Sequence, residues 1–120
     1  MTDQPNPAPP SALAGLRVLD LTSRMGGFCG KLLANLGADV YLIEPPAGDP
    51  TRLQGPFKSD VRHPEGSLAF AAYHTNKRAL VLDLEREEGR QSFCRLVGGA
   101  DVVIEDRAPG YLEKIGLGYD

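Results

Sequence analysis

The chain has 120 residues, of which 42% are hydrophobic and 24% are charged, and its formal net charge is −3 at pH 7. This size and balance are typical of one small globular domain. The mildly acidic charge gives no reason to expect nucleic acid as a partner, although it leaves room for a local basic site that binds a phosphate-bearing ligand.

Signals for secretion, membrane insertion and metal binding are missing from the sequence. No apolar run approaches the about 20 residues that span a bilayer, and no basic segment followed by an apolar run opens the chain. The two cysteines, Cys29 and Cys94, do not have the spacing of a metal site or a disulfide framework. We therefore expect a cytoplasmic protein with two buried free thiols, no metal site and no membrane contact.

Residues 1–12 differ in composition from the rest of the chain. They include four prolines, at positions 5, 7, 9 and 10. Proline lacks the backbone N–H that helices and sheets use, so this segment is expected to be a disordered leader. The folded part is then expected at residues 13–120.

From residue 13 onward, strand-like and helix-like segments alternate. The expected strands are residues 17–21, 40–43, 79–84 and 101–104. The expected helices are residues 28–36, which Gly37 terminates, 67–74, which should pack on the sheet, and 87–97. A long proline-rich loop is expected at residues 45–66. This order predicts an α/β fold with a Rossmann-like, open, largely parallel sheet and flanking helices.

Polar turns follow the predicted strands. Residues 23–27 (S-R-M-G-G) precede a helix, so their backbone amides are able to hold an anion, or the glycines simply permit a tight turn. Residues 76–78 (N-K-R) form either a clamp for phosphate or carboxylate, or a polar turn held by salt bridges. We expect Asp20 and Asp83 to cap turns, and the lone His63 and His74 to be surface or packing residues.

Four segments resemble, in family order, the family III coenzyme A transferases (the carnitine dehydratase and bile-acid-inducible protein group). They are L-A-G-L-R-V-L-D-L-T at 13–22, L-L-A-N-L-G-A-D-V at 32–40 with its continuation to residue 52, N-K-R-A-L-V-L-D-L at 76–84, and A-D-V-V-I-E-D-R-A-P-G at 100–110 with its continuation to residue 120. Members of this family are far longer than 120 residues. The resemblance therefore implies that residues 13–120 are the truncated amino-terminal part of the large domain.

The resemblance also implies a coenzyme A site at the carboxyl ends of the strands. The residues that it assigns to coenzyme binding are Met25, Gly26, Leu82, Asp83, Asp106, Arg107 and Lys114. The family uses an Asp nucleophile that lies beyond the segment matching residue 120, so no catalytic residue is assigned within this chain. The implied partners are an acyl-CoA and a carboxylic acid. The full-length protein is expected to be an interlocked homodimer, and the 120-residue chain alone to be inactive and poorly stable.

The chain departs from the family pattern at three positions in this region. Glu85 replaces a frequent Lys, Asp106 replaces an Asn, and Arg107 replaces an aromatic residue whose stacking role a guanidinium plane can also fill. Two carboxylates near an anionic coenzyme are expected to weaken its binding. Two alternatives stay open: an α-methylacyl-CoA racemase-like isomerase, and a non-catalytic coenzyme-binding or dimerisation segment.

Overall fold

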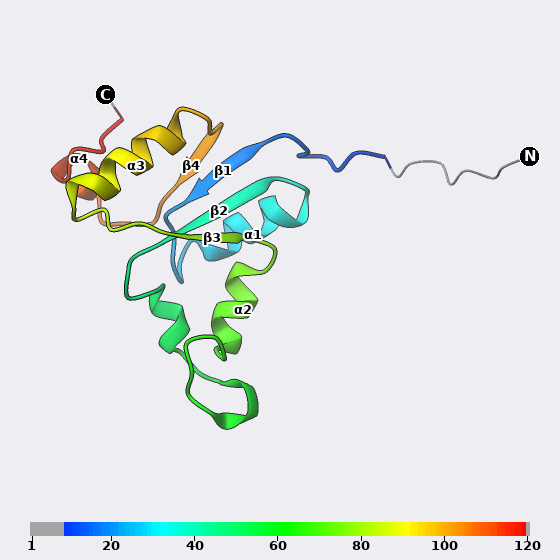
Figure 1. Cartoon of the computed structure of the whole chain (residues 1–120). Coiled ribbons are helices and arrows are strands. Elements are labelled where there is room, and N and C mark those ends of the chain that lie inside the picture. The colour runs from blue at the N-terminus through cyan, green and yellow to red at the C-terminus, as the bar shows by residue number, and fades with distance from the viewer. Residues whose placement is uncertain (1–8, 120) are drawn as a thin grey trace, which may run out of the picture.

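A computed structural model describes residues 9–119, and its centre is a sheet of four parallel strands (Figure 1). The strands are β1 (Arg17–Asp20), β2 (Asp39–Glu44), β3 (Arg78–Val81) and β4 (Val102–Ile104), in the spatial order β3-β2-β1-β4. β1 pairs in parallel with both β2 and β4, and β2 pairs in parallel with β3. The predicted Rossmann-like α/β fold is therefore confirmed.

The two central strands are almost entirely buried because helices cover both faces of the sheet. Val18 and Leu19, which are adjacent in β1 and point to opposite faces, are both completely buried. Val18 packs with the side chains of α1 (Gly27–Asn35), whereas Leu19 packs with Phe93 of α3 (Glu87–Val97). Burial on both faces explains why β1 and β2 are continuous apolar runs and do not alternate with polar residues.

The face that α1 presents to the sheet is made of small residues. Its buried residues are Gly27 and Gly30, with Leu33 partly buried behind them. Two larger apolar residues of the same helix, Phe28 and Leu32, are about half exposed, at 54% and 45%. The small residues face inward because they let the helix lie close to the sheet and to the polar groups beneath it.

The segment between β2 and β3 projects away from the sheet in Figure 1. It contains the short 3₁₀ turns η1 (Pro50–Leu53) and η2 (Lys58–Asp60) and then α2 (Leu68–His74), whose N-cap Ser67 accepts a hydrogen bond from the Phe70 amide. α2 makes its main contacts with α1 and η1, so the expectation that it packs on the sheet was wrong. The predicted loop at residues 45–66 is confirmed as mostly irregular.

Two further expectations change in detail. β3 ends at Val81, before the predicted residue 84, because Asp83 folds into a turn in which its side chain accepts from the Glu85 amide. This confirms Asp83 as a turn cap. Cys29 and Cys94 are free but exposed, so the expectation of buried thiols was wrong. The predicted leader at residues 1–12 lies largely outside the described residues, and residues 9–12 form neither helix nor strand.

Gly89 in α3 gives a direct test of how the loop after β3 packs. A Cβ atom at this position would lie 1.8 Å from the carbonyl oxygen of Asp83. We expect Gly89→Ala to lower the free energy of unfolding by about 1–3 kcal/mol, because the clash with backbone outweighs the higher helix propensity of Ala. Urea unfolding measures the change. Gly98→Ala is the control, since its Cβ would meet only the Arg95 carbonyl at 3.4 Å, and equal stability of both variants would contradict this packing.

Candidate functional site

The strand order reverses direction between β1 and β4, and the turns that follow these two strands meet there. Open α/β folds place ligands in the crevice outside the carboxyl ends of the strands at such a point. The Asp106 carboxylate, just after β4, accepts hydrogen bonds from the backbone N–H groups of Gly26 (2.8 Å) and Ser23 (3.1 Å). These two backbone N–H groups belong to the turn that the sequence analysis considered for binding an external anion. In the structure they bind the Asp106 carboxylate.

Local packing fixes the shape of this turn. Asp20 Oδ1 accepts from the backbone N–H (2.8 Å) and the hydroxyl (2.6 Å) of Thr22, which confirms that Asp20 caps the turn. A Cβ at Gly26 would lie 2.6 Å from the Thr22 methyl group, so only glycine fits without a shift. Met25 stands at the tip of the turn, where it is 88% exposed.

A buried ion pair lies directly beneath the turn. Lys77 Nζ lies 2.6 Å from Asp20 Oδ2, and both side chains are at most 1% exposed. The same ammonium donates to the Gly27 carbonyl at 2.8 Å and lies 2.9 Å from His74 Nδ1. A Cβ at Gly30 would lie 2.2 Å from Asp20 Oδ2, so α1 can cover the pair only with glycine there. Of the two interpretations of residues 76–78, the turn held by salt bridges therefore describes Lys77.

A second buried cluster joins the end of β2 to η1. Arg52 binds Glu44 through two parallel contacts, Nε to Oε1 at 2.6 Å and Nη2 to Oε2 at 2.9 Å. The Arg52 guanidinium also stacks over the Phe70 ring at 3.8 Å. Asp49 donates its backbone N–H to Glu44 at 2.9 Å, and its carboxylate accepts from Thr51 and Ser23. The projecting segment is thus tied to the turn at residues 23–27.

These contacts shift the acid–base behaviour of both carboxyl groups. The hydrogen bond from Arg52 lowers the pKa of Glu44. Burial raises the pKa of Asp49, but the facing His74 and the hydrogen bonds from Thr51 outweigh it and lower that pKa from 3.8 to about 2. Each carboxyl group therefore stabilises the fold in its ionised form.

We expect the free energy of unfolding to fall as the pH drops from about 5 to about 2. Because the pKa of Asp49 is lower in the folded state than in the unfolded state, ionised Asp49 stabilises the fold at pH values above its unfolded-state pKa. This stabilisation is lost as the pH falls through the folded-state pKa. For Asp49 the loss is on the order of 2 kcal/mol. Urea unfolding across this range should show a flatter pH dependence for Asp49→Asn than for wild type. Asp60→Asn, at an exposed site, is the control and should leave the slope unchanged.

The turns after β3 and β4 converge on a third cluster around α4 (Tyr111–Lys114). The Tyr111 hydroxyl donates to Glu85 at 2.6 Å, and Arg107 lies 5.6 Å from the Tyr111 ring. The hydrogen bond to Glu85 raises the pKa of Tyr111, and Asp83 is close enough to add to that effect. Glu85 therefore has a partner within the chain.

The structure brings the predicted coenzyme residues into two groups. Met25, Gly26 and Asp106 share the turn at the β1–β4 crevice, while Asp83 and Arg107 both lie near Tyr111. Leu82 is partly buried against the hydrophobic core, and Lys114 is exposed at the end of α4. The sequence analysis missed the polar groups behind the turn. They are His74, Asp49, Glu44 and Arg52. For Glu44 the signal was a charged residue at the end of a buried strand.

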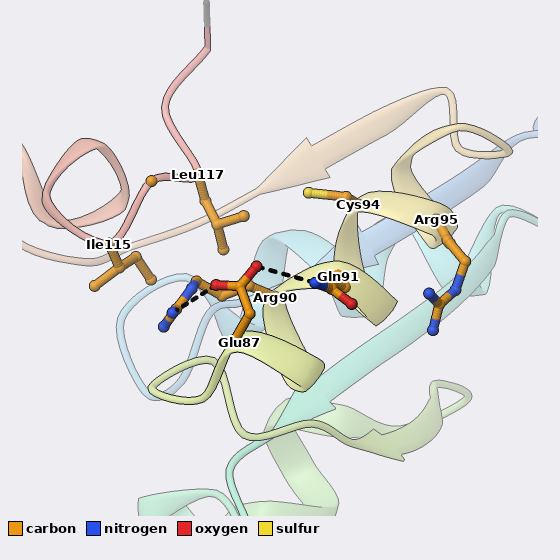
Figure 2. A pocket seen from close by; sticks show the side chains of 8 residues that line it. Glu87, Arg90, Gln91, Cys94, Arg95, Ile115 and Leu117 are labelled. Atoms are coloured by element: carbon orange, nitrogen blue, oxygen red, sulfur yellow. Dashed lines mark hydrogen bonds and ion pairs between the residues drawn. The ribbon is translucent and has the colours of Figure 1, made fainter.

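Two hollows lie on the α3 side of the sheet. Figure 2 shows the smaller one, of about 490 Å³, between α3 and Ile115–Leu117, where Glu87 accepts from Arg90 and Gln91. The larger, of about 970 Å³, runs along β4 and α4 and reaches Arg107. Within residues 9–119, no three His, Cys, Asp or Glu side chains are grouped to hold a metal ion, and no helix has the length and apolar character to cross a membrane.

Comparison with known proteins identifies curated transferases as relatives. The chain is 43% identical over 104 residues to a subunit of succinyl-CoA:(R)-benzylsuccinate CoA-transferase from Thauera aromatica, covering 87% of this chain and 25% of that protein. It is 44% identical over 126 residues to succinate–glutarate CoA-transferase from Agrobacterium fabrum, covering 100% of this chain and 30% of that protein. The chain thus spans between a quarter and a third of the length of these relatives.

A solved structure and a family model agree with this result. A CAIB/BAIF family protein from Brucella suis superimposes with a TM-score of 0.81 at 40% identity, over 92% of this chain and 30% of that protein. The model that describes CoA-transferase family III matches residues 13–120. This match covers all four strands and the three polar clusters described above. The chain belongs to CoA-transferase family III.

Proposed function

We propose that the complete protein moves coenzyme A between an acyl-CoA thioester and a free carboxylic acid. The observation that carries this proposal is the family match over residues 13–120, together with relatives named as CoA-transferases. The reaction would use an Asp carboxylate supplied by a part of the protein other than these residues, as the family resemblance implies. We propose no catalytic residue within the chain itself.

The chemistry is an exchange of carboxylates on one thiol. The enzyme carboxylate attacks the thioester carbonyl, and the C–S bond breaks to give a mixed anhydride and the coenzyme thiolate. The thiolate then attacks the enzyme's own carbonyl, which releases the first acid and leaves an enzyme thioester. The acceptor carboxylate and the thiolate repeat these steps in reverse order, so the enzyme carboxylate is regenerated.

This chain is proposed to supply much of the coenzyme pocket at the carboxyl ends of β1, β3 and β4. Met25 and Gly26 would contact the coenzyme at the crevice, Leu82 and Asp83 would border it, and Arg107 would stack on the adenine. The exposure of Met25 and its place at the reversal of strand order support this assignment. Asp106 would act by holding the turn, because its carboxylate already accepts two backbone hydrogen bonds.

The internal partners change the expected effect of the two extra carboxylates. Asp106 accepts hydrogen bonds from two backbone amides and Glu85 accepts one from the Tyr111 hydroxyl, so each negative charge is partly stabilised within the chain. Replacing Asp106 with Asn removes the negative charge that binds the backbone N–H groups of Ser23 and Gly26. We therefore propose that Asp106→Asn weakens coenzyme binding by loosening the turn, which reverses the expectation from sequence alone.

The test is a transfer assay on the complete protein. A purified sample is incubated with succinyl-CoA and a set of free carboxylic acids, and new acyl-CoA products are separated by chromatography. Formation of a new thioester with loss of succinyl-CoA supports the proposal. Exchange of the α-proton of a 2-methylacyl-CoA with deuterium, without any new thioester, would overturn it in favour of an isomerase. Binding of coenzyme A with neither reaction would overturn it in favour of a non-catalytic segment.

Lys114 is expected to bind a coenzyme phosphate, because the family resemblance assigns it to the coenzyme site and its side chain is exposed at the end of α4. We expect Lys114→Ala to weaken binding of coenzyme A by about tenfold, as loss of one charge-assisted hydrogen bond implies. Calorimetric titration of the complete protein measures the change. Lys58→Ala, at an exposed position on η2, is the matched control. Equal affinities for both variants would remove Lys114 from the site.

We further propose that the complete protein is a cytoplasmic homodimer and that the 120-residue chain alone is inactive and poorly stable. The exposed apolar side chains of α1 and Val103 on the edge strand β4 support the second part, since such surfaces usually lie against other parts of a protein. Light scattering after size-exclusion chromatography tests whether the complete protein is a dimer and whether the isolated chain aggregates.

A further inference from the structure

Lys77 Nζ has three close neighbours: one partner in an ion pair and two in hydrogen bonds. Its Nζ lies 2.6 Å from Asp20 Oδ2, 2.8 Å from the Gly27 carbonyl oxygen and 2.9 Å from His74 Nδ1. An ammonium group can only donate. His74 Nδ1 must therefore accept, and the proton of a neutral imidazole must sit on Nε2.

The opposite side of the His74 ring faces a carboxylate. Nε2 lies 3.7 Å from Asp49 Oδ1, which is too long for a direct hydrogen bond but close enough for the carboxylate charge to favour a proton on Nε2. The same Oδ1 atom accepts from the Ser23 hydroxyl at 3.2 Å and from the Thr51 amide at 2.8 Å. His74 thus lies between Lys77, which binds the Gly27 carbonyl, and Asp49, which binds the Ser23 hydroxyl.

The ring also fills the space beside the turn. A Cβ at Gly27 would lie 3.1 Å from His74 Cε1, so the imidazole packs directly on the first residue of α1. On its other side the ring lies 4.9 Å from the centre of the Phe70 ring. The His74 side chain is only 1% exposed. The imidazole is therefore enclosed where it stands and does not reach a ligand itself.

We propose that His74 is a positioning residue for the turn at residues 23–27. As the Nε2–H tautomer it spans Lys77 and Asp49, and through them it fixes both ends of the turn that faces the ligand. The role rests on the proposed function in one respect, because it is the coenzyme that this turn would contact. His74 would affect binding without touching coenzyme or reacting atoms.

The first test determines the His74 tautomer in the wild-type protein. Nitrogen-15 NMR of the histidine side chains in the complete protein reports which ring nitrogen carries the proton, and the His74 signal is assigned by its loss in His74→Gln. We expect Nε2 to be protonated and Nδ1 to be unprotonated. A proton on Nδ1 would overturn the inference, because that nitrogen could not then accept from Lys77.

The second test separates the turn from the ligand. Hydrogen–deuterium exchange of the amides at residues 23–27 is measured in His74→Phe, which keeps a ring but loses both polar contacts, and in His74→Gln, which keeps a donor. His63→Phe is the control, because His63 is an exposed histidine. We expect at least tenfold faster exchange in His74→Phe, a smaller change in His74→Gln, and none in the control. Unchanged exchange at residues 23–27 in both His74 variants would overturn the inference.

Coenzyme A titration of the same variants links the turn to the site. We expect about tenfold weaker binding for His74→Phe than for wild type, in the range that residues acting through others produce. Wild-type affinity in a variant whose turn exchanges faster would overturn the positioning role. Absence of binding by wild type, with the expected exchange result, would contradict the proposed function and leave the structural link between His74 and the turn supported.

Discussion

Lys77→Met is expected to lower the free energy of unfolding by about 3–5 kcal/mol, the cost of leaving one partner of a buried ion pair without the other. Asp20 is completely buried, and its Oδ2 faces Lys77 at 2.6 Å. Methionine matches the volume of the lysine stem but offers no proton to that oxygen. A loss of this size is a large share of the about 5–15 kcal/mol that stabilises an ordinary domain.

Urea unfolding measures this loss, and Arg78→Met is the matched control. Arg78 is the next residue and pairs with Asp39 at 3.2 Å, but its side chain is 71% exposed, so its removal should cost less than about 1 kcal/mol. Asp20→Asn combined with Lys77→Met should recover part of the loss, because no buried charge then stands alone. If Lys77→Met is no more destabilising than Arg78→Met, the buried pair does not stabilise the fold.

Arg52→Met is expected to cost about 3 kcal/mol or more, because it leaves the buried Glu44 carboxylate without its two-pronged partner. Glu44 is only 3% exposed, and it also accepts the Asp49 amide. The substitution additionally removes the stacking of Arg52 over Phe70. We expect the loss to appear both in the global unfolding free energy and in faster proteolysis of the segment between β2 and α2.

Two further variants define the cause of this effect. Arg52→Lys keeps the charge but cannot make parallel contacts, so its stability should lie between those of wild type and Arg52→Met. Arg62→Met removes an exposed arginine that stacks over Phe57 at 5.2 Å, and it should change stability by less than about 1 kcal/mol. Equal stability of Arg52→Met and Arg62→Met would contradict the assigned role of the Glu44–Arg52 pair.

The strands and α3 were predictable because their patterns reflect local chemistry. The residues of β1 and β2 are apolar runs of the kind that a parallel sheet buries, and α3 was predicted at its observed bounds, 87–97. The orientation of α1 was not predictable in the same way. A helix with apolar residues on two sides can bury either, and the choice of the side with Gly27 and Gly30 depends on the Asp20–Lys77 pair that lies under it.

The site was predictable as a region but not as a set of contacts. Strand ends in an open α/β fold identified the turn near Gly26 and the residues near Asp106, and the structure brings these together. The partners of Asp106 could not be predicted, because they are backbone amides some 80 positions earlier in the chain. The contacts of His74 could not be predicted for the same reason. Its neighbours Lys77 and Asp49 come close to it only when α2 packs on α1 and η1.

A crystal structure of the complete protein with coenzyme A tests the central claim most directly. We predict that the coenzyme crosses the carboxyl ends of the strands, with Met25 and Gly26 against it, Arg107 beside the adenine and a phosphate within hydrogen-bonding distance of Lys114. Asp106 should remain bonded to the amides of the turn. A coenzyme bound at the amino ends of the strands, or in the hollow between α3 and residues 115–117, would contradict the site proposed for this chain.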